Sequence, residues 1–247
     1  MSKGKIPKLI IHGLTDEGLV RKHNEDTIFW DSEIGLVTLA DGMGGHNAGE
    51  VASDIAVSSI TQSLSVHSQN NTISLDVINK TIVDANNKIN LHAKNHPECS
   101  GMGTTIVTAL FQEQSVFLAS VGDSRIYRFR QGELKQLTTD HSLIQEMIDN
   151  GYMSEEEALA SANRNLITRA LGIDKTVEVD VAEHKIIQDD IYLLCSDGLS
   201  DMVEDKDIFA TLVKARNDIA RGSEDLVALA KEKGGKDNIS VILVSCK

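Results

Sequence analysis

Residues 36–46 read LVTLADGMGGH, and this stretch decides how the chain is interpreted. An apolar run of strand length ends at Asp41, and the glycines that follow permit a sharp turn and close approach of the backbone to a ligand. Two further apolar runs end beside an aspartate, at Asp123 and Asp197. Carboxylates fixed at strand ends and brought together would repel one another, and a divalent cation would relieve that repulsion. The pattern predicts a hard-cation site built from strand ends.

A fourth aspartate, Asp237, lies in a similar context, just before the last apolar run. Oxygen ligands alone favour Mg²⁺ or Mn²⁺ over zinc or copper. The alternative for each position is a solvated turn aspartate, the usual role of Asp beside Gly or Asn. Taken alone, residues 41–46 fit a tight turn into a helix as well as they fit a site. A Walker-type phosphate loop is excluded, because no Lys-Ser or Lys-Thr follows the glycines.

The composition indicates one soluble domain over residues 1–247, since 41% of the residues are hydrophobic and only two are proline. The net charge of -13 argues against nucleic acid or an anionic membrane as a partner. The three cysteines are far apart and form no CxxC, which disfavours a zinc cluster or a disulfide framework. No apolar stretch approaches the roughly 20 residues of a membrane span, and no signal-peptide pattern occurs. We therefore expect a cytoplasmic protein.

The hydrophobic periodicity changes several times along the chain, and the short connections between residues 104 and 138 predict antiparallel pairing. Strands are predicted at 8–13, 26–30, 35–40, 104–110, 115–121, 125–130, 134–138, 177–184, 191–195 and 239–245, and helices at 49–64, 75–92, 142–150, from 154, 208–214 and 224–231. This order predicts helices that cover a pair of packed antiparallel sheets.

Residues 17–26 read EGLVRKHNED and place Arg21 close to two acidic residues, Glu25 and Asp26. The planar guanidinium of arginine binds phosphate oxygens bidentately, which suits an anion held beside metal ions. An exposed basic loop is the alternative interpretation of this segment in isolation.

Short motifs in a fixed order extend over nearly the whole chain. They lie at residues 18–26, 41–46 with 49–53, 103–105, 121–125, 137–142, 167–172, 195–199 and 236–240. The ordered set resembles the metal-dependent PP2C (PPM) family of protein serine/threonine phosphatases, in its short bacterial form. The resemblance implies an α+β fold, a four-layer α/β/β/α sandwich with a metal centre between the edges of two antiparallel sheets.

The resemblance also implies two tightly bound Mg²⁺ or Mn²⁺ ions. Asp41 would bridge the two ions, and the carbonyl of Gly42 would be a further ligand. Asp197 and Asp237 would hold the first ion. Asp123, together with Asp197, would hold a third, looser ion.

Three further assignments rest on the same resemblance. Glu25 and Asp26 match positions that hold metal-bound waters or ligate weakly. Arg21 would grip the substrate phosphate. Residues 141–166 would form a mobile flap beside the site.

The proton donor is left open by one departure from the animal-type pattern. Those members have histidine where this chain has Met43, which cannot donate a proton. His46 is the available imidazole, a metal-bound water is its rival, and a structural contact near the helix start is a further interpretation of His46.

The function implied is hydrolysis of phosphoserine and phosphothreonine in proteins by a metal-activated bridging water. The expected partners are phosphorylated proteins, a cognate Ser/Thr kinase and the substrates of that kinase, and we expect a monomer. Two alternatives remain: a phosphoprotein-binding pseudophosphatase, and a metal-dependent hydrolase of small phosphate esters. The first should lack a metal carboxylate, and none of the principal ones is missing.

Overall fold

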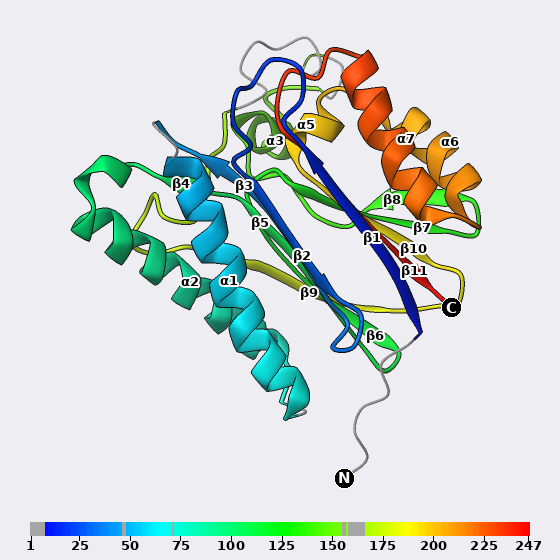
Figure 1. The fold of residues 1–247 in the computed structure, drawn as a ribbon, viewed down its shortest axis with the longest axis horizontal. Helices are drawn as coiled ribbons and strands as arrows, with labels where there is room; N and C mark the ends of the chain where they lie inside the picture. Colours follow the sequence, from blue (N-terminus) through cyan, green and yellow to red (C-terminus); the bar gives the residue numbers. More distant parts are fainter. Residues whose placement is uncertain (1–7, 46–47, 71, 155–156, 158–165) are drawn as a thin grey trace.

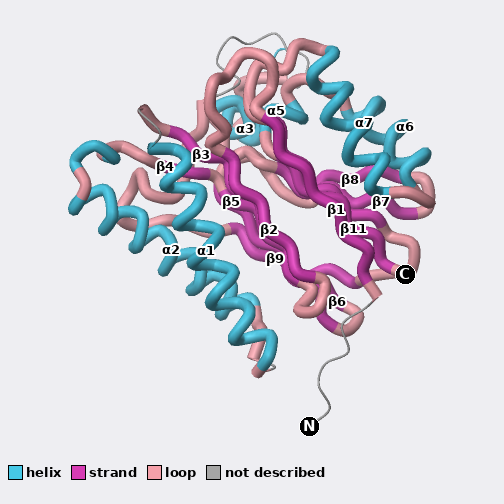
Figure 2. Tube along the Cα trace, viewed as in Figure 1, coloured by secondary structure: helices cyan, strands magenta, loops and turns pink. Residues whose placement is uncertain are grey.

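The computed structural model describes residues 8–45, 48–70, 72–154, 157 and 166–247. Two antiparallel sheets pack face to face, and helices cover the outer face of each (Figures 1 and 2). The predicted α+β four-layer sandwich is confirmed. No helix among the described residues is long and apolar enough to cross a membrane.

The first sheet combines the two ends of the chain. Its strands, in spatial order, are β1 (Leu9–Asp16), β11 (Ile239–Cys246), β10 (Ile191–Cys195), β7 (Arg125–Arg130) and β8 (Glu133–Gln136). Strands β10 and β11 are the most deeply placed pair, since every residue of both is buried. On the outer face lie α6 (Asp205–Ala215) and α7 (Ile219–Glu232), whose buried side chains form one core with this sheet.

The second sheet is built mainly from the first half of the chain. Its strands, in spatial order, are β2 (Asp26–Asp31), β3 (Leu36–Met43), β5 (Ile106–Gln112), β6 (Ser115–Val121) and β9 (Asp180–Lys185), with the short β4 (Gly103–Thr104) paired to the end of β3. Two long helices, α1 (Ala48–Gln69) and α2 (Leu75–Asn95), cover its outer face (Figure 1).

Side-chain alternation along the strands positions the site, because successive residues point to opposite faces of a sheet. In β3, Leu36 and Ala40 pack toward the helices, whereas Val37 and Leu39 pack between the sheets. Asp41 continues the second series. The layer between the sheets is therefore apolar along most of β3 and ends in a carboxylate.

Several predicted elements differ in extent from those observed. The strand predicted at 104–110 is broken at Thr105, and helix α7 begins five residues earlier than predicted, where Asp218 Oδ1 accepts a hydrogen bond from Arg221 N. The helix predicted at 142–150 is α3 (Leu143–Asp149), capped by Ser142 Oγ. Two short helices were not predicted, η1 (Pro97–Cys99) and α5 (Asp197–Ser200).

The second helix of the predicted flap lies mostly outside the described residues. At its start, Ser154 and Glu157 form a reciprocal capping box: Ser154 N donates to Glu157 Oε2 (2.9 Å), and Glu157 N donates to Ser154 Oγ (3.3 Å). This agrees with the helix start predicted at Ser154.

Candidate active site

Acidic side chains converge where the layer between the two sheets changes from apolar to polar. Asp26 on β2 and Asp41 on β3 are directly opposed in the antiparallel register. Asp197 begins α5 just beyond the end of β10. The pKa of Asp41 is raised by burial and then by the charges of Asp26, Asp197, Asp123 and Asp237. The structure thus brings together five of the acidic residues that the sequence singled out.

Three of these carboxylates carry a buried oxygen that accepts no hydrogen bond from any described residue. The atoms are Oδ1 of Asp26, Oδ1 of Asp123 and Oδ1 of Asp197. A buried carboxylate oxygen without a donor is costly. These oxygens are therefore the places where a cation or a water would be most stabilising.

Asp26 is buried, with 8% of its surface exposed. Its Oδ2 accepts hydrogen bonds from Ser240 Oγ (2.6 Å) and Ser196 Oγ (3.0 Å), side chains that come from the opposite sheet. Burial raises the pKa of Asp26 to about 6, although the two serine hydroxyls act in the opposite direction. Asp26 thereby ties the two sheets together at the site.

The end of β3 is held by Thr104 on β4 and by Thr105, which lies between β4 and β5. Asp41 N donates to Thr105 Oγ1 (3.0 Å), and Asp41 O accepts from Thr105 N (2.9 Å) and Thr104 Oγ1 (2.9 Å). These bonds explain the break at Thr105, whose backbone amide and hydroxyl both bind the main chain of Asp41. The Asp41 backbone is thus fixed before any ligand binds.

Gly42 allows three segments to meet beside Asp41. Its N donates to Glu25 O (3.1 Å), and a Cβ at this position would collide with the carbonyl oxygens of Gly49 and Glu25. The carboxyl group of Glu25 lies against Gly49 at the start of α1. Burial raises the pKa of Glu25. A larger residue than glycine at position 42 would separate the Glu25 loop from the end of β3.

Arg21 lies at the rim of the site and is paired with Asp237. Its NH2 donates to Asp237 Oδ2 (2.6 Å), and 51% of the Arg21 side chain is exposed. The loop before it is held against Asp237 as well, because a Cβ on Gly18, whose φ is +79°, would collide with the Asp237 carbonyl. Asp237 Oδ1 accepts from Asn238 N (2.8 Å). Asp237 is thus the predicted ligand that already has partners on both oxygens.

Asn238 organises this loop, a role that the sequence did not reveal. Its Nδ2 donates to Glu17 O (3.1 Å) and His23 O (2.9 Å), and its Oδ1 accepts from Glu25 N (2.9 Å). The side chain therefore binds three backbone groups of the segment that carries Arg21. In the sequence, only the position of Asn238 directly after Asp237 could have indicated this role.

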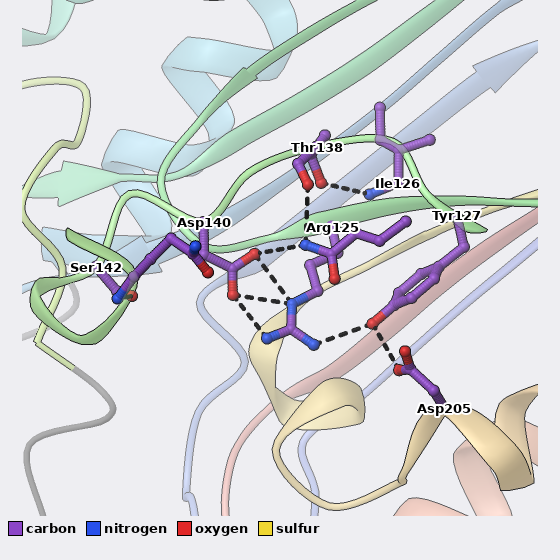
Figure 3. Close-up of polar contacts among 9 residues, drawn as sticks. Arg125, Ile126, Tyr127, Thr138, Asp140, Ser142 and Asp205 are labelled. Atoms are coloured by element: carbon purple, nitrogen blue, oxygen red, sulfur yellow. Dashed lines mark hydrogen bonds and ion pairs between the residues drawn. The ribbon is translucent and has the colours of Figure 1, made fainter. Parts of the chain in front are cut away.

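The turn that carries Asp123 is braced by a polar network, shown in Figure 3. Arg125 binds Asp140 through Nε (2.9 and 3.0 Å) and NH2 (2.6 Å), and its NH1 donates to Tyr127 OH (3.0 Å). Tyr127 OH in turn donates to Asp205 Oδ1 (3.1 Å). Burial, with Asp140 as the next cause, raises the pKa of Asp123 to about 7. The network links the Asp123 turn to the start of the predicted flap.

His141 joins the same two segments on the other side of Asp140. Its backbone N donates to Gly122 O (2.9 Å), and its ring Nδ1 accepts from Gly122 N (3.0 Å). His141 Nε2 lies 3.2 Å from Asp180 Oδ2. The residue is buried, with 7% of its surface exposed. The sequence motif contained His141, but no role was predicted for it.

The buried carboxylates of the cluster disfavour ionisation of one another. Burial and the neighbouring carboxylates raise the pKa of Asp197 well above its ordinary value, with Asp123 and Asp237 as the largest charged causes. Among the described residues, no three or more His, Cys, Asp or Glu side chains are arranged to hold one ion by themselves. Mg²⁺ commonly keeps several waters and uses only one or two carboxylates. The carboxylate oxygens present therefore fit metal ions that take only some of their ligands from the protein.

His46, one of the two candidates for the proton donor, lies outside the described residues, and so do residues 155–156 and 158–165 of the predicted flap.

Comparison with known proteins identifies the family. The family model described as Protein phosphatase 2C matches residues 20–232. The serine/threonine phosphatase stp of Listeria monocytogenes is 38% identical over 239 residues, which cover 93% of each chain. The serine/threonine protein phosphatase PstP of Mycobacterium tuberculosis is 38% identical over 232 residues, 93% of this chain and 43% of that protein.

Solved structures agree with the sequence relatives. The crystal structure of Mycobacterium tuberculosis PstP/Ppp has a TM-score of 0.89 at 36% identity and covers 97% of this chain and 99% of that one. Stp1 of Staphylococcus aureus has a TM-score of 0.87 at 37% identity and covers 100% and 98%. The fold, shared with these phosphatase structures, and the sequence relatives define a phosphatase of the 2C class. The chain belongs to the protein phosphatase 2C family, and the predicted family and serine/threonine phosphatase class are confirmed.

Proposed function

We propose that the acidic cluster and Arg21 form the active site at which this chain hydrolyses phosphoserine and phosphothreonine in proteins. The observation that carries the proposal is the convergence of Asp26, Asp41, Asp123 and Asp197 around buried carboxylate oxygens that lack a hydrogen-bond donor. Carboxylates that repel one another in this way are typical of functional sites, where a bound ligand can relieve the repulsion. Because the donors are all oxygens, the proposed ligand is Mg²⁺ or Mn²⁺.

The assignments of individual ligands are part of this proposal. Asp41 would be shared by two ions, Gly42 would contribute its carbonyl, and Asp197 and Asp237 would hold the first ion. Asp123 would support a third ion together with Asp197. The catalytic domain of PstP has been crystallised in complex with two manganese ions, at 35% identity and a TM-score of 0.85 to this chain.

Glu25 and Asp26 are proposed to act through ordered water. Asp26 Oδ2 already accepts two serine hydroxyls, which leaves Oδ1 as its free acceptor. Glu25 is held beside Gly49, and its backbone binds Gly42, Ser53 and Asn238. Both side chains are thus positioned to orient water at the edge of the cluster.

When bound, the ions would supply positive charge for the phosphoryl oxygens and lower the pKa of a water for in-line attack. Arg21 would bind the phosphate with its guanidinium, which the exposed half of its side chain allows. Its present partner, Asp237, keeps the guanidinium at the rim and raises the pKa of Arg21. The cysteines have no role in the proposal, since burial raises the pKa of Cys195 to about 12.

The remaining expectations are proposals as well. His46 or a water would donate the proton to the leaving hydroxyl. Residues 1–247 would form one catalytic domain, with a flap from 141 to 166. Phosphorylated proteins, including substrates of a cognate kinase, would be the partners of a cytoplasmic monomer.

The test measures turnover of a phosphothreonine peptide and of p-nitrophenyl phosphate. Each substrate is assayed with at least about 2 equivalents of Mn²⁺ per enzyme, the number of ions in a two-metal site. Each is assayed again with an excess of chelator. We expect turnover of both substrates with Mn²⁺ and none with chelator. Asp197→Asn should abolish turnover, whereas Asp84→Asn, a matched change on the exposed face of α2, should not.

Other outcomes identify the alternatives. Undiminished turnover in chelator would refute the metal-dependent mechanism. Hydrolysis of small esters without hydrolysis of the peptide would favour a small-ester hydrolase, and peptide binding without any hydrolysis would favour a pseudophosphatase.

A further inference from the structure

A groove of about 640 Å³ runs between β1, the loop that follows it and the outer face of α7. Its apolar lining residues, called the floor, are Leu14, Leu19, Val227 and Ala228. Two of its acidic lining residues, Glu224 and Glu232, are called the rim. The groove lies outside the acidic cluster, and none of the residues assigned to the phosphatase site lines it.

The groove is continuous with the loop that carries Arg21. Leu19 lies two residues before Arg21, so their Cα atoms are within about 8 Å of each other. Leu19 N donates to Gly235 O (2.7 Å), and Gly235 lies two residues before Asp237. A chain whose phosphate binds at Arg21 therefore reaches the groove within about two to four residues.

The loop presents apolar side chains to solvent at this point. Leu19 is 62% exposed and Val20 is 65% exposed. Neighbouring apolar side chains on a surface, rimmed by polar groups, are typical of sites that bind a partner. A bound apolar side chain would cover Leu19 and the exposed Ala228 together.

The charged residues around the groove determine which residues could flank a bound apolar side chain. Lys231 is already neutralised, because its Nζ binds Asp16 Oδ1 (3.0 Å) and Oδ2 (2.9 Å). Glu224 is contacted only loosely, by Arg221 at 3.3 Å, and Arg221 also binds Asp225. The rim thus presents Glu224 and Glu232 as acceptors for a cation. The net charge of -13 favours basic partners over the whole surface.

We propose that this groove binds the substrate segment beside the phosphorylated residue and selects an apolar side chain with a lysine or arginine next to it. The inference rests on the proposed function, because Arg21 fixes the phosphate and hence the distance to the groove. A phosphoprotein segment is the occupant that the position favours, since the groove opens beside the loop that would hold the phosphate. Apolar burial would supply affinity, and the acidic rim would set the charge preference.

The test uses three phosphothreonine peptides and p-nitrophenyl phosphate. The first peptide carries leucine three residues from the phosphothreonine on each side, with an arginine beside each leucine. The second replaces the leucines by serine, and the third replaces the arginines by glutamate. We expect kcat/KM to fall about fivefold for the second and the third, less than an enclosed hydrophobic pocket achieves because the groove is open to solvent.

Two variants locate the effect. Ala228→Arg fills the floor of the groove and keeps a good helix former at an exposed helical position, and Glu224→Lys with Glu232→Lys reverses the rim. Ala228→Arg should remove the preference for leucine, and the double reversal should favour the peptide that carries glutamate. Neither should change hydrolysis of p-nitrophenyl phosphate, which is too small to reach the groove. The matched control, Glu33→Lys with Glu133→Lys, has the same change in charge on exposed sites away from the groove and should keep the wild-type preference.

The outcomes separate this proposal from the proposed function. Equal kcat/KM for the three peptides, with normal hydrolysis of p-nitrophenyl phosphate, overturns the groove and leaves the phosphatase site standing. Loss of hydrolysis of all four substrates by the wild type overturns both. If Ala228→Arg changes the oligomeric state on gel filtration and leaves the peptide preference intact, the groove is a contact between copies of the chain and the proposal is wrong.

Discussion

Asp26 and Asp41 are directly opposed on the neighbouring strands β2 and β3. Like charges in that position destabilise an antiparallel sheet. The main chain of Asp41 is nevertheless held by Thr104 and Thr105, and the carboxylate of Asp26 is held by Ser196 and Ser240. The protein therefore maintains a repulsive pair in a rigid frame, an arrangement typical of a site made for cations.

The first prediction separates stability from activity at Asp41. Asp41→Asn removes one of the two opposed charges and keeps a side chain of the same shape. In chelator, Tm should rise by about 2–4 °C, the shift that roughly 1 kcal/mol gives in a chain of this size. In Mn²⁺, turnover of p-nitrophenyl phosphate should fall about 100-fold or more.

Thermal unfolding in chelator and steady-state rates in Mn²⁺ measure both effects. Asp84→Asn, with its charge removed from the exposed face of α2, should leave both unchanged. A lower Tm for Asp41→Asn in chelator would show that the carboxylate stabilises the fold rather than opposing it.

The second prediction concerns pH in the absence of metal. Burial raises the pKa of Asp26 to about 6 and that of Asp123 to about 7, above the ordinary value near 4. In the unfolded chain these groups lose their protons near pH 4, whereas in the folded chain they keep them to higher pH. The stability that protonation provides is complete below about pH 4 and is lost as the pH rises to about 7.

Urea unfolding in chelator at pH 5 and pH 7.5 measures the loss. Asp123→Asn should make the difference between the two pH values smaller, and saturating Mn²⁺ should abolish most of it. Equal losses in the wild type and in Asp123→Asn would mean that other groups set the pH dependence.

The third prediction assigns the role of Arg21. Arg21→Ala should raise KM about tenfold for a phosphothreonine peptide, because the bidentate contact to the phosphate is lost, with a smaller effect on kcat. Arg21→Lys should recover only part of the affinity, since an ammonium is a point charge without the planar fork. Steady-state kinetics on both variants test this, with Lys22→Ala as the neighbouring control. Unchanged kinetics in Arg21→Ala would leave the Arg21–Asp237 pair as a contact of the loop alone.

The sequence predicted the layers of the fold because the apolar pattern has period two in the strands and near 3.6 in the helices. It also singled out Asp41, Asp123 and Asp197, which lie at or just beyond the ends of apolar runs and which the structure brings together. Their meeting could not be deduced, because β3 and β10 lie in different sheets, and only the packing of the two sheets brings these distant parts of the chain together.

Residues whose side chains bind backbone groups far away in the sequence could not be predicted for the same reason. Asn238 binds carbonyls and an amide between residues 17 and 25, more than 200 positions away in the sequence. A lone asparagine after an aspartate predicts a local turn and gives no sign of such a contact. The early start of α7 was missed because the cap residue, Asp218, precedes the first strongly periodic residues.

The last prediction tests the brace behind Asp123. Arg125 and Asp140 form a largely buried bidentate pair, in which 26% of the Arg125 side chain and 12% of the Asp140 side chain are exposed. Asp140→Asn leaves a buried guanidinium without its counter-charge, which typically costs about 3 kcal/mol and should lower Tm by about 6–12 °C. Because Arg125 lies two residues after Asp123, the Mn²⁺ concentration for half-maximal activity should rise several-fold as well, on the scale seen when groups that orient metal ligands are removed.

Tyr127→Phe is a smaller change in the same network, since it removes only the hydroxyl between Arg125 and Asp205 (Figure 3). We expect a loss of about 1 kcal/mol with little change in the Mn²⁺ requirement. Thermal unfolding and Mn²⁺ titrations of activity distinguish the two variants. If Asp140→Asn lowers Tm and leaves the Mn²⁺ titration at the wild-type midpoint, the pair supports the fold alone and does not position Asp123.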